Sequence, residues 1–268
     1  MSPVEHTKPA PERVADALAR LYDLDLASDP GDLDLYLALA ARTGGPVLEL
    51  AVGSGRVAVP LAAAGYDVTG VDLDAAMLAR ARAAADAGGK ATARRLRLVR
   101  GDARSVRLEG APAHWLATVP LNSIFLMGGR ADQAAAVATL AAHLVPGGLA
   151  VLDAWLPDAD DLARYDGSLV LEWVRDDPDS GHTVTKTCAA EYDAATSTVR
   201  LTTIFESGTQ GDAPSRWVRV DHLRLVGPDE LAAFAEGAGL VVEELAGGYG
   251  LEPLEPGAER VVLIARKP

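Results

Sequence analysis

The residues that most clearly indicate a chemical role are two glycines and a carboxylate, Gly53, Gly55 and Asp72. Glycines let a backbone turn tightly and come close to a ligand. A helix that follows such a loop presents free N–H groups and a positive dipole end. A carboxylate at the end of the next strand is placed to accept hydrogen bonds from ribose hydroxyls. These residue types at this spacing predict a site for a ligand that contains a nucleoside.

The segments around these residues are predicted to form the scaffold that positions them. The apolar run at residues 47–50 is typical of a buried strand, and the Ala-rich segment at 57–64 predicts a helix. A β-branched run at residues 66–71 predicts a second strand that ends on Asp72. The order of strand, tight loop, helix and strand is that of a βαβ unit.

Two classes of nucleoside ligand fit this unit. Gly53-x-Gly55-x-x-Ala58 matches the dinucleotide fingerprint, and Asp72 follows at about the right distance. Glu49 argues against a dinucleotide, because a carboxylate beside the loop would repel a pyrophosphate. A sulfonium ligand that carries an amino group brings positive charge and suits Glu49 better.

The sequence of the loop also resembles a known family. Residues 48–56, LELAVGSGR, resemble the first motif of class I S-adenosylmethionine (SAM)-dependent methyltransferases. Residues 71–74 and the helix that follows at 77–82 resemble that family's second-strand acid and next helix. The turn Leu-x-Pro-Gly-Gly at residues 144–148 is similar as well. Ala51 departs from the pattern, because the family usually has Gly there. The resemblance implies that S-adenosyl-L-methionine is the co-substrate.

The resemblance also implies which residues bind the cofactor. Asp102, after a predicted third strand at 96–99, resembles the acid that hydrogen-bonds the adenine amino group; a surface turn is its alternative. In the family, N-terminal helices cover the cofactor, often through a Tyr-Asp pair such as Tyr22-Asp23; a solvated acidic loop is the alternative for the aspartates. The expected cofactor-binding residues are Tyr22, Glu49, Ala51, Gly53, Ser54, Gly55, Arg56, Asp72, Leu73, Met77, Asp102, Ala103 and Pro120.

Candidate substrate-binding residues follow the fourth and fifth predicted strands, at 115–119 and 149–153. Ligands of open α/β sheets gather at the carboxyl ends of strands, which is where Asn122, Ser123 and Trp155 fall. Asn122 and Ser123 are also residue types that cap helices, so that alternative stays open.

Asp153 and His222 are the candidate catalytic residues, each as a general base. Their alternatives are a turn or cap residue for Asp153 and a surface histidine for His222. A sulfonium already carries its leaving group, so alignment of the acceptor and exclusion of water are the main tasks of such an enzyme. A base helps only if the acceptor arrives protonated.

The expected fold class is α/β, a Rossmann-like class I methyltransferase fold with a mostly parallel sheet. An antiparallel C-terminal strand pair and an antiparallel β insertion complete it. We expect a helical cap at 1–46, a SAM-binding core at 47–156, an insertion at 157–226 and completing elements at 227–268. The insertion is a candidate substrate lid or dimer face. Its aromatic residues could line an acceptor pocket or pack on the core: Tyr165, Trp173, Tyr192, Phe205 and Trp217.

The composition narrows the class of protein and its partners. A net charge of −13 disfavours nucleic acid as a partner, because binding to nucleic acid depends on neutralising phosphates. Residues 1–11 are expected to be a disordered lead without a signal peptide, and no apolar run is long enough to span a membrane. The single cysteine, Cys188, fits a reducing cytoplasm, and too few Cys and His cluster for a zinc site.

The sequence therefore favours a cytoplasmic SAM-dependent methyltransferase that is a monomer or a homodimer. Its acceptor is expected to be a nitrogen or oxygen, with carbon possible, of a small organic molecule. An NAD(P)-dependent oxidoreductase and a non-catalytic binding protein of the same fold remain the alternatives.

Overall fold

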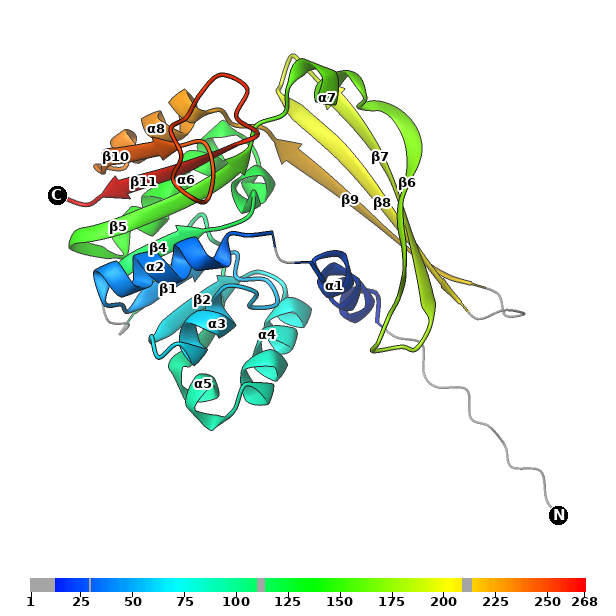
Figure 1. The fold of residues 1–268 in the computed structure, drawn as a ribbon, viewed down its shortest axis with the longest axis horizontal. Helices are drawn as coiled ribbons and strands as arrows, with labels where there is room; N and C mark the ends of the chain where they lie inside the picture. Colours follow the sequence, from blue (N-terminus) through cyan, green and yellow to red (C-terminus); the bar gives the residue numbers. More distant parts are fainter. Residues whose placement is uncertain (1–12, 29, 110–113, 209–213) are drawn as a thin grey trace.

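The computed structural model describes residues 13–28, 30–109, 114–208 and 214–268. These residues form a helix-covered seven-stranded sheet and a separate four-stranded sheet, with helix α1 lying between the two (Figure 1). The strands of the first sheet are β1 (Val47–Leu50), β2 (Val68–Asp72), β3 (Leu96–Arg100), β4 (His114–Val119), β5 (Leu144–Trp155), β10 (Val241–Ala246) and β11 (Arg260–Arg266). The strands of the second sheet are β6 (Asp166–Asp176), β7 (Thr183–Asp193), β8 (Thr198–Gly208) and β9 (Ser215–Arg224). The helices are α1 (Val14–Asp25), α2 (Leu33–Thr43), α3 (Ala58–Ala63), α4 (Ala75–Ala87), α5 (Lys90–Arg95), the 3₁₀ helix η1 (Ser123–Met127), α6 (Arg130–Ala142), α7 (Ala159–Ala163) and α8 (Pro228–Gly237).

The first sheet has the strand order β10-β11-β5-β4-β1-β2-β3. Strands β1 to β5 pair in parallel, and β11 runs antiparallel to both β5 and β10. This arrangement confirms the predicted fold class. The chain order reverses between β1 and β4, and ligands of open α/β sheets bind at such a point.

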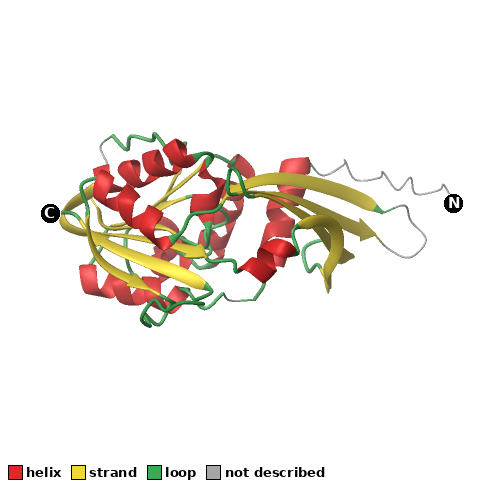
Figure 2. Cartoon of the chain, turned by 90° about the horizontal axis from the view of Figure 1, so that it is seen from above, coloured by secondary structure: helices red, strands yellow, loops and turns green. Residues whose placement is uncertain are grey.

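Burial explains why these segments form the centre of the sheet. All four residues of β1 are buried, as expected for a parallel strand that is covered on both faces. Leu39 of α2 and Leu61 of α3 pack on one face of the sheet. Leu140 of α6 and Phe234 of α8 pack on the other face. Figure 2 shows the resulting three layers, with the second sheet projecting to one side.

Helix α1 has two apolar faces that contact different parts of the molecule. Leu21 and Leu24 pack against Val184 and Phe205 of the second sheet. Its other face packs on α4 through Ala19 with Ala76 and Met77, and through Tyr22. The helix therefore joins the second sheet to the first.

The strand predicted at residues 47–50 is observed with these bounds as β1, and the third strand predicted at 96–99 is observed as β3. The predicted turn at residues 145–148 is instead part of β5, which begins at Leu144. Its backbone is paired with the C-terminal segment, because Gly147 N donates to Lys267 O at 2.7 Å and Arg266 donates to Gly147 O at 2.7 Å. Gly147 has a positive φ of 85°, which accommodates the irregular backbone inside the strand.

One prediction, the expected disordered lead at residues 1–11, concerns residues that lie outside the described part of the chain. Among the helices that the structure describes, none has both the length and the apolar character needed to cross a membrane.

Candidate active site

The glycine loop after β1 is held in place by Asp72. Gly53 N donates to Asp72 Oδ2 at 2.8 Å, and Asp74 N donates to Asp72 Oδ1 at 2.9 Å. Gly53 has a φ of 54°, a conformation that L side chains rarely adopt. A Cβ on Gly55 would lie 2.8 Å from Val59 Cγ2, so glycine is required there for α3 to pack closely.

A cavity of about 760 Å³ opens above this loop and is called the main cavity here. It contains the predicted residues Tyr22, Ala51, Gly53, Asp72, Leu73, Met77, Asp102, Ala103 and Ser123. It is also lined by residues that the sequence did not single out: Val14, Ala15, Leu18, Ala19, Asp74, Gly101, Arg104, Leu126, Met127, Gly128 and Arg219. Gly55 is buried beneath the loop and lines neither this cavity nor the recess beside it.

A narrow recess beside the main cavity holds the remaining predicted cofactor residues. Glu49, Ser54, Arg56 and Pro120 line it together with Tyr22. Glu49 is only 2% exposed, and its Oε2 has no hydrogen-bond partner. Burial raises the pKa of Glu49 to about 8; the charge of Arg56 acts to lower it, and the charges of Asp32 and Asp72 act to raise it. An unpartnered buried carboxyl oxygen is suited to accept hydrogen bonds from an ammonium group.

Arg56 faces Glu49 but is fixed by a different carboxylate. Its guanidinium donates to both oxygens of Asp32, at 2.6 and 2.7 Å, and Asp32 is fully buried. A two-point pair of this kind holds the arginine in one orientation. The recess therefore contains a fixed positive group and a buried acid with one unpartnered oxygen.

Asp102 lines the main cavity, and its carboxylate is already hydrogen-bonded within the protein. Arg104 donates to it through Nη2 at 2.6 Å and through Nε at 2.9 Å. These hydrogen bonds lower the pKa of Asp102. Arg104 thus forms part of the wall at this end of the cavity.

The prediction of Asp153 as a general base does not fit its surroundings. Asp153 is fully buried and accepts from Tyr36 Oη at 2.7 Å, Leu121 N at 2.7 Å, Tyr249 Oη at 3.0 Å and Arg260 at 2.8 Å. Both carboxylate oxygens are therefore occupied by the protein itself. The residue instead anchors the turn after β4 to the core.

The turn that Asp153 anchors has an unusual backbone. Leu121 and Asn122 both have positive φ values, 49° and 61°. Such conformations cost non-glycine residues free energy and cluster at functional sites. Asn122 Oδ1 accepts from Trp155 N at 2.6 Å and does not cap η1, which leaves the capping alternative without support.

His222 lies away from both the main cavity and the recess. It is exposed on β9, whereas Arg219, Asp221 and Leu223 point to the opposite, partly buried face. Because successive side chains of a strand alternate, His222 faces solvent while Arg219 reaches the main cavity. The prediction of His222 as a base is therefore wrong for this geometry.

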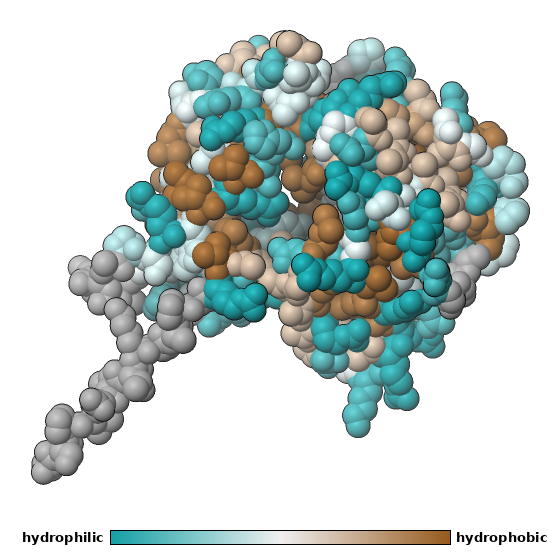
Figure 3. All heavy atoms as spheres, turned by 180° about the vertical axis from the view of Figure 1, so that it is seen from behind, coloured by the Kyte–Doolittle hydropathy of each residue, from teal (hydrophilic) through white to brown (hydrophobic). Residues whose placement is uncertain are grey.

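A second cavity of about 460 Å³ lies between the second sheet and η1. Asn122 and Trp155 line it, together with Tyr165, whose ring centre is 6.2 Å from that of Trp155. Leu126 lines both this cavity and the main cavity, so the two are neighbours. Figure 3 shows apolar side chains on both sides of the hollow between the second sheet and the core.

A bulge in β6 determines which residues of this strand face inward. Val170 pairs with Cys188 and Trp173 with Lys186, so Glu172 is an extra residue. Val170 lines the second cavity and Trp173 packs toward α1, although their spacing would place them on opposite faces of a regular strand. Glu172 lines the second cavity and, among the described residues, contributes the only carboxylate of its lining. Within the described residues, no group of His, Cys, Asp or Glu is arranged to hold a metal ion.

Comparisons with known proteins agree with this geometry. Residues 47–148 match the model of a methyltransferase domain. The CcbJ methyltransferase from Streptomyces caelestis is 25% identical, with a TM-score of 0.74 over 90% of this chain and 98% of that one. The SAM-bound amino pentose methyltransferase CalS10 from Micromonospora echinaspora is 22% identical, with a TM-score of 0.69 over 98% and 100%. The sugar N-methyltransferase KedS8 from Streptoalloteichus is 21% identical, with a TM-score of 0.71 over 100% and 98%. A search of curated proteins found no match.

Proposed function

Because the chain is a class I SAM-dependent methyltransferase, we propose that it methylates an amine nitrogen of a small, ring-containing organic molecule. The observation that carries the proposal is the second cavity, which adjoins the main cavity at Leu126. Its volume of about 460 Å³ is within the range of small-molecule sites. A sugar-sized acceptor would fit such a space.

The residues of the main cavity and the recess suit the cofactor. Asp72 lies where ribose hydroxyls would donate, and Gly53 leaves the backbone open to a ligand. The unpartnered oxygen of Glu49 would accept from the amino group of the methionine part. When bound, SAM supplies a methyl group that is activated by a positively charged sulfur.

The lining of the second cavity favours an amine. Glu172 is the only carboxylate of that lining, and the aromatic rings of Trp155 and Tyr165 lie beside each other in it. Glu172 lies 2.8 Å from Lys186 Nζ, and its carboxylate can still accept hydrogen bonds from the N–H groups of a neutral amine. The rings would cover the apolar face of a sugar or similar ring. Two of the solved neighbours are an amino pentose methyltransferase and a sugar N-methyltransferase, which supports the same acceptor class.

The chain's own contribution to the reaction is then positioning. The strained turn at Leu121 and Asn122 forms part of the second cavity, and Leu126 stands between the acceptor and the cofactor. Fixed walls of this kind align the acceptor and exclude water. We infer no dedicated general base, because an amine can be neutral when it attacks. The net charge of −13 supports a small molecule over nucleic acid as the partner.

The test is product analysis with a panel of amino sugars and their hydroxyl counterparts. The purified protein is incubated with SAM and each candidate, and mass spectrometry follows methylated product and S-adenosylhomocysteine. We expect N-methylation of at least one amino sugar and none of its hydroxyl counterpart. The Glu172→Gln variant should lose about tenfold in kcat/KM for the amine, and Glu191→Gln, an exposed acid of the neighbouring strand, should not. Methylation of the hydroxyl compounds alone would refute the amine assignment.

A further inference from the structure

Helix α1 forms one wall of the main cavity. Val14, Leu18 and Tyr22 line the cavity from this helix, and Tyr22 also borders the recess that contains Glu49. The cavity is partly open to solvent, and α1 covers part of a ligand that is bound in it. What holds α1 in place therefore affects the exchange of the ligand.

The C-terminal end of α1 is fixed to the second sheet. Asp25 accepts from Trp173 Nε1 at 2.8 Å and from Lys186 Nζ at 2.6 Å. Arg175 donates to the carbonyl oxygen of Leu24 at 2.6 Å. Lys186 also lies 2.8 Å from Glu172, so the same contacts extend to the second cavity. We treat α1 and the second sheet as one body and call it the cap.

Three segments of the chain connect the cap to the core. Two of them, after β5 and after β9, lie together near α7 in Figure 1, and the third leads from α1 to α2. At the end where the first two lie, Arg224 donates to Gln133 at 2.6 Å and to Glu230 at 2.9 Å. The turn between β6 and β7 lies at the far end of the sheet. Opening of the cap would separate that far end from α4.

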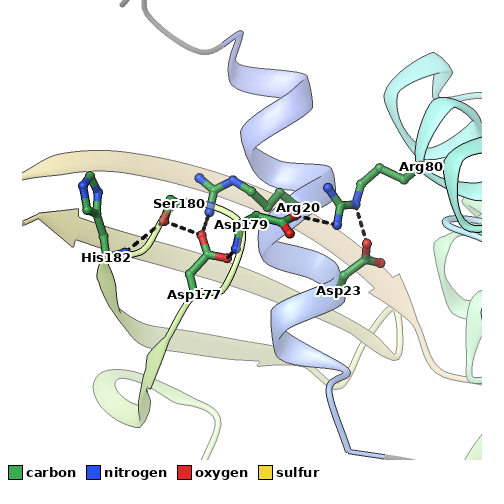
Figure 4. A network of polar contacts seen from close by, with 7 residues as sticks. All are labelled: Arg20, Asp23, Arg80, Asp177, Asp179, Ser180 and His182. Carbon is green, nitrogen blue, oxygen red and sulfur yellow. Dashed lines mark hydrogen bonds and ion pairs between the residues drawn. The ribbon is translucent and has the colours of Figure 1, made fainter. Parts of the chain in front are cut away.

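At this far end one arginine of the core holds both parts of the cap. Arg80 of α4 donates to Asp23 of α1, and it donates to Asp179 in the β6–β7 turn at 2.9 Å. Asp177 of the same turn pairs with Arg20 of α1, so the turn and the helix are bound to each other (Figure 4). Asp177 is 2% exposed, whereas the side chain of Arg80 is 32% exposed.

We propose that Arg80 is a positioning residue that latches the cap over the cofactor and sets the rate at which the cofactor product leaves. This proposal rests on the proposed function, because it takes the main cavity as the SAM site. Arg80 does not line the main cavity and would act through α1 and the β6–β7 turn. Its partly exposed pairs can break and re-form, while the more buried pair of Arg20 and Asp177 keeps the cap in one piece.

The experiment measures the dissociation rate of S-adenosylhomocysteine from the full chain by surface plasmon resonance. In Arg80→Ala we expect the rate to rise about threefold to tenfold, as two partly exposed ion pairs are lost. Arg80→Lys should restore part of the difference. In the wild type the rate should rise with ionic strength, because these pairs are screened by salt, and in Arg80→Ala this dependence should be reduced.

Two further variants separate the latch from a general effect on the fold. Asp179→Asn removes one arm of the latch without touching α1, and its effect should not add to that of Arg80→Ala. Arg95→Ala removes a surface pair with Asp67 on the core and should leave the rate unchanged. If Arg80→Ala does not fold, Asp179→Asn carries the test.

A dissociation rate in Arg80→Ala equal to that of the wild type would overturn the latch while leaving the cofactor site intact. The same holds for Asp179→Asn where it carries the test. Failure of the wild type to bind S-adenosylhomocysteine at all would overturn the cofactor site, and the latch with it.

Discussion

The buried carboxyl group of Glu49 leads to the prediction that ligand binding releases a proton. Its carboxyl group is buried and has a pKa of about 8, so the group is mostly protonated at neutral pH in the ligand-free protein. An ammonium group placed at its unpartnered oxygen would favour the ionised form and lower the pKa. Binding of S-adenosylhomocysteine, which carries this ammonium group, should therefore release the proton of Glu49.

The size of the effect follows from the pKa. With a pKa of about 8, the carboxyl is about 90% protonated at pH 7, so binding should release about 0.9 proton. The same linkage makes binding tighter by about ninefold between pH 6 and pH 7, as the competing proton becomes scarcer. The charges of Arg56, Asp32 and Asp72, which lie near Glu49, contribute to this pKa.

Calorimetric titration in buffers of different ionisation enthalpy measures the released proton directly. Glu49→Gln is the matched variant, and it should bind more weakly with an affinity that is flat between pH 6 and pH 7. Wild-type binding that releases no proton and has no pH dependence over this range would refute the reasoning.

The stability of the ligand-free protein gives an independent check. The folded pKa lies above the usual 4.5, so the contribution of Glu49 to stability is present below about pH 4.5 and is lost as pH rises through 8. Over the full range from pH 4.5 to above pH 8 this loss is on the order of 5 kcal/mol. Relative to the wild type, Glu49→Gln should therefore become more stable as pH is raised.

Three other residues give predictions. Asp72→Ala removes the acceptor that fixes the glycine loop, so affinity for S-adenosylhomocysteine should fall at least about 50-fold by calorimetry; unchanged affinity would contradict the assigned pocket. Asp153→Ala leaves Arg260 without its acid and should lower the free energy of unfolding in urea by about 3–5 kcal/mol, and a loss below about 1 kcal/mol would argue against the anchoring role. Burial lowers the pKa of His114 from 6.5 to about 4, so stability should be kept above pH 6.5 and fall by about 3 kcal/mol as pH drops toward 4. Denaturation of wild type and His114→Leu at pH 6.5 and pH 4 measures this loss. An equal change of the free energy of unfolding with pH in the two proteins would contradict the prediction.

The part of the site that could be predicted from the sequence is the part built by local interactions. Gly53 and Asp72 belong to one βαβ unit, and the hydrogen bond between them joins two neighbouring strand ends. The glycine spacing and the apolar runs therefore indicated the loop, the strand and the acid together. Glu49 belongs to the same unit, since it is part of β1, whereas Tyr22 and Pro120 bring other segments to the recess.

The rest depends on contacts between distant segments. The partners of Asp153 come from four segments: helix α2, strand β11, the turn after β4 and the loop after β10. No local sequence pattern relates these segments. Asp153 therefore looked like a free acid at a strand end. Arg219 could not be found because it reaches the main cavity from the second sheet. Glu172 needed the bulge in β6, which shifts the alternation that sequence patterns assume.

The segment after β4 has a consequence for altering this enzyme. Ser123 faces the main cavity, Asn122 the second, and Leu126 both. With the proposed assignment of the two cavities, we expect substitutions in this segment to change cofactor affinity and acceptor choice together. Selection for a new acceptor there would then be constrained by the need to keep cofactor binding. Val170, Ala190 and Val199 of the second sheet line the second cavity and not the main cavity. A new acceptor range is therefore reached most directly by varying the sheet, with the segment after β4 left as it is.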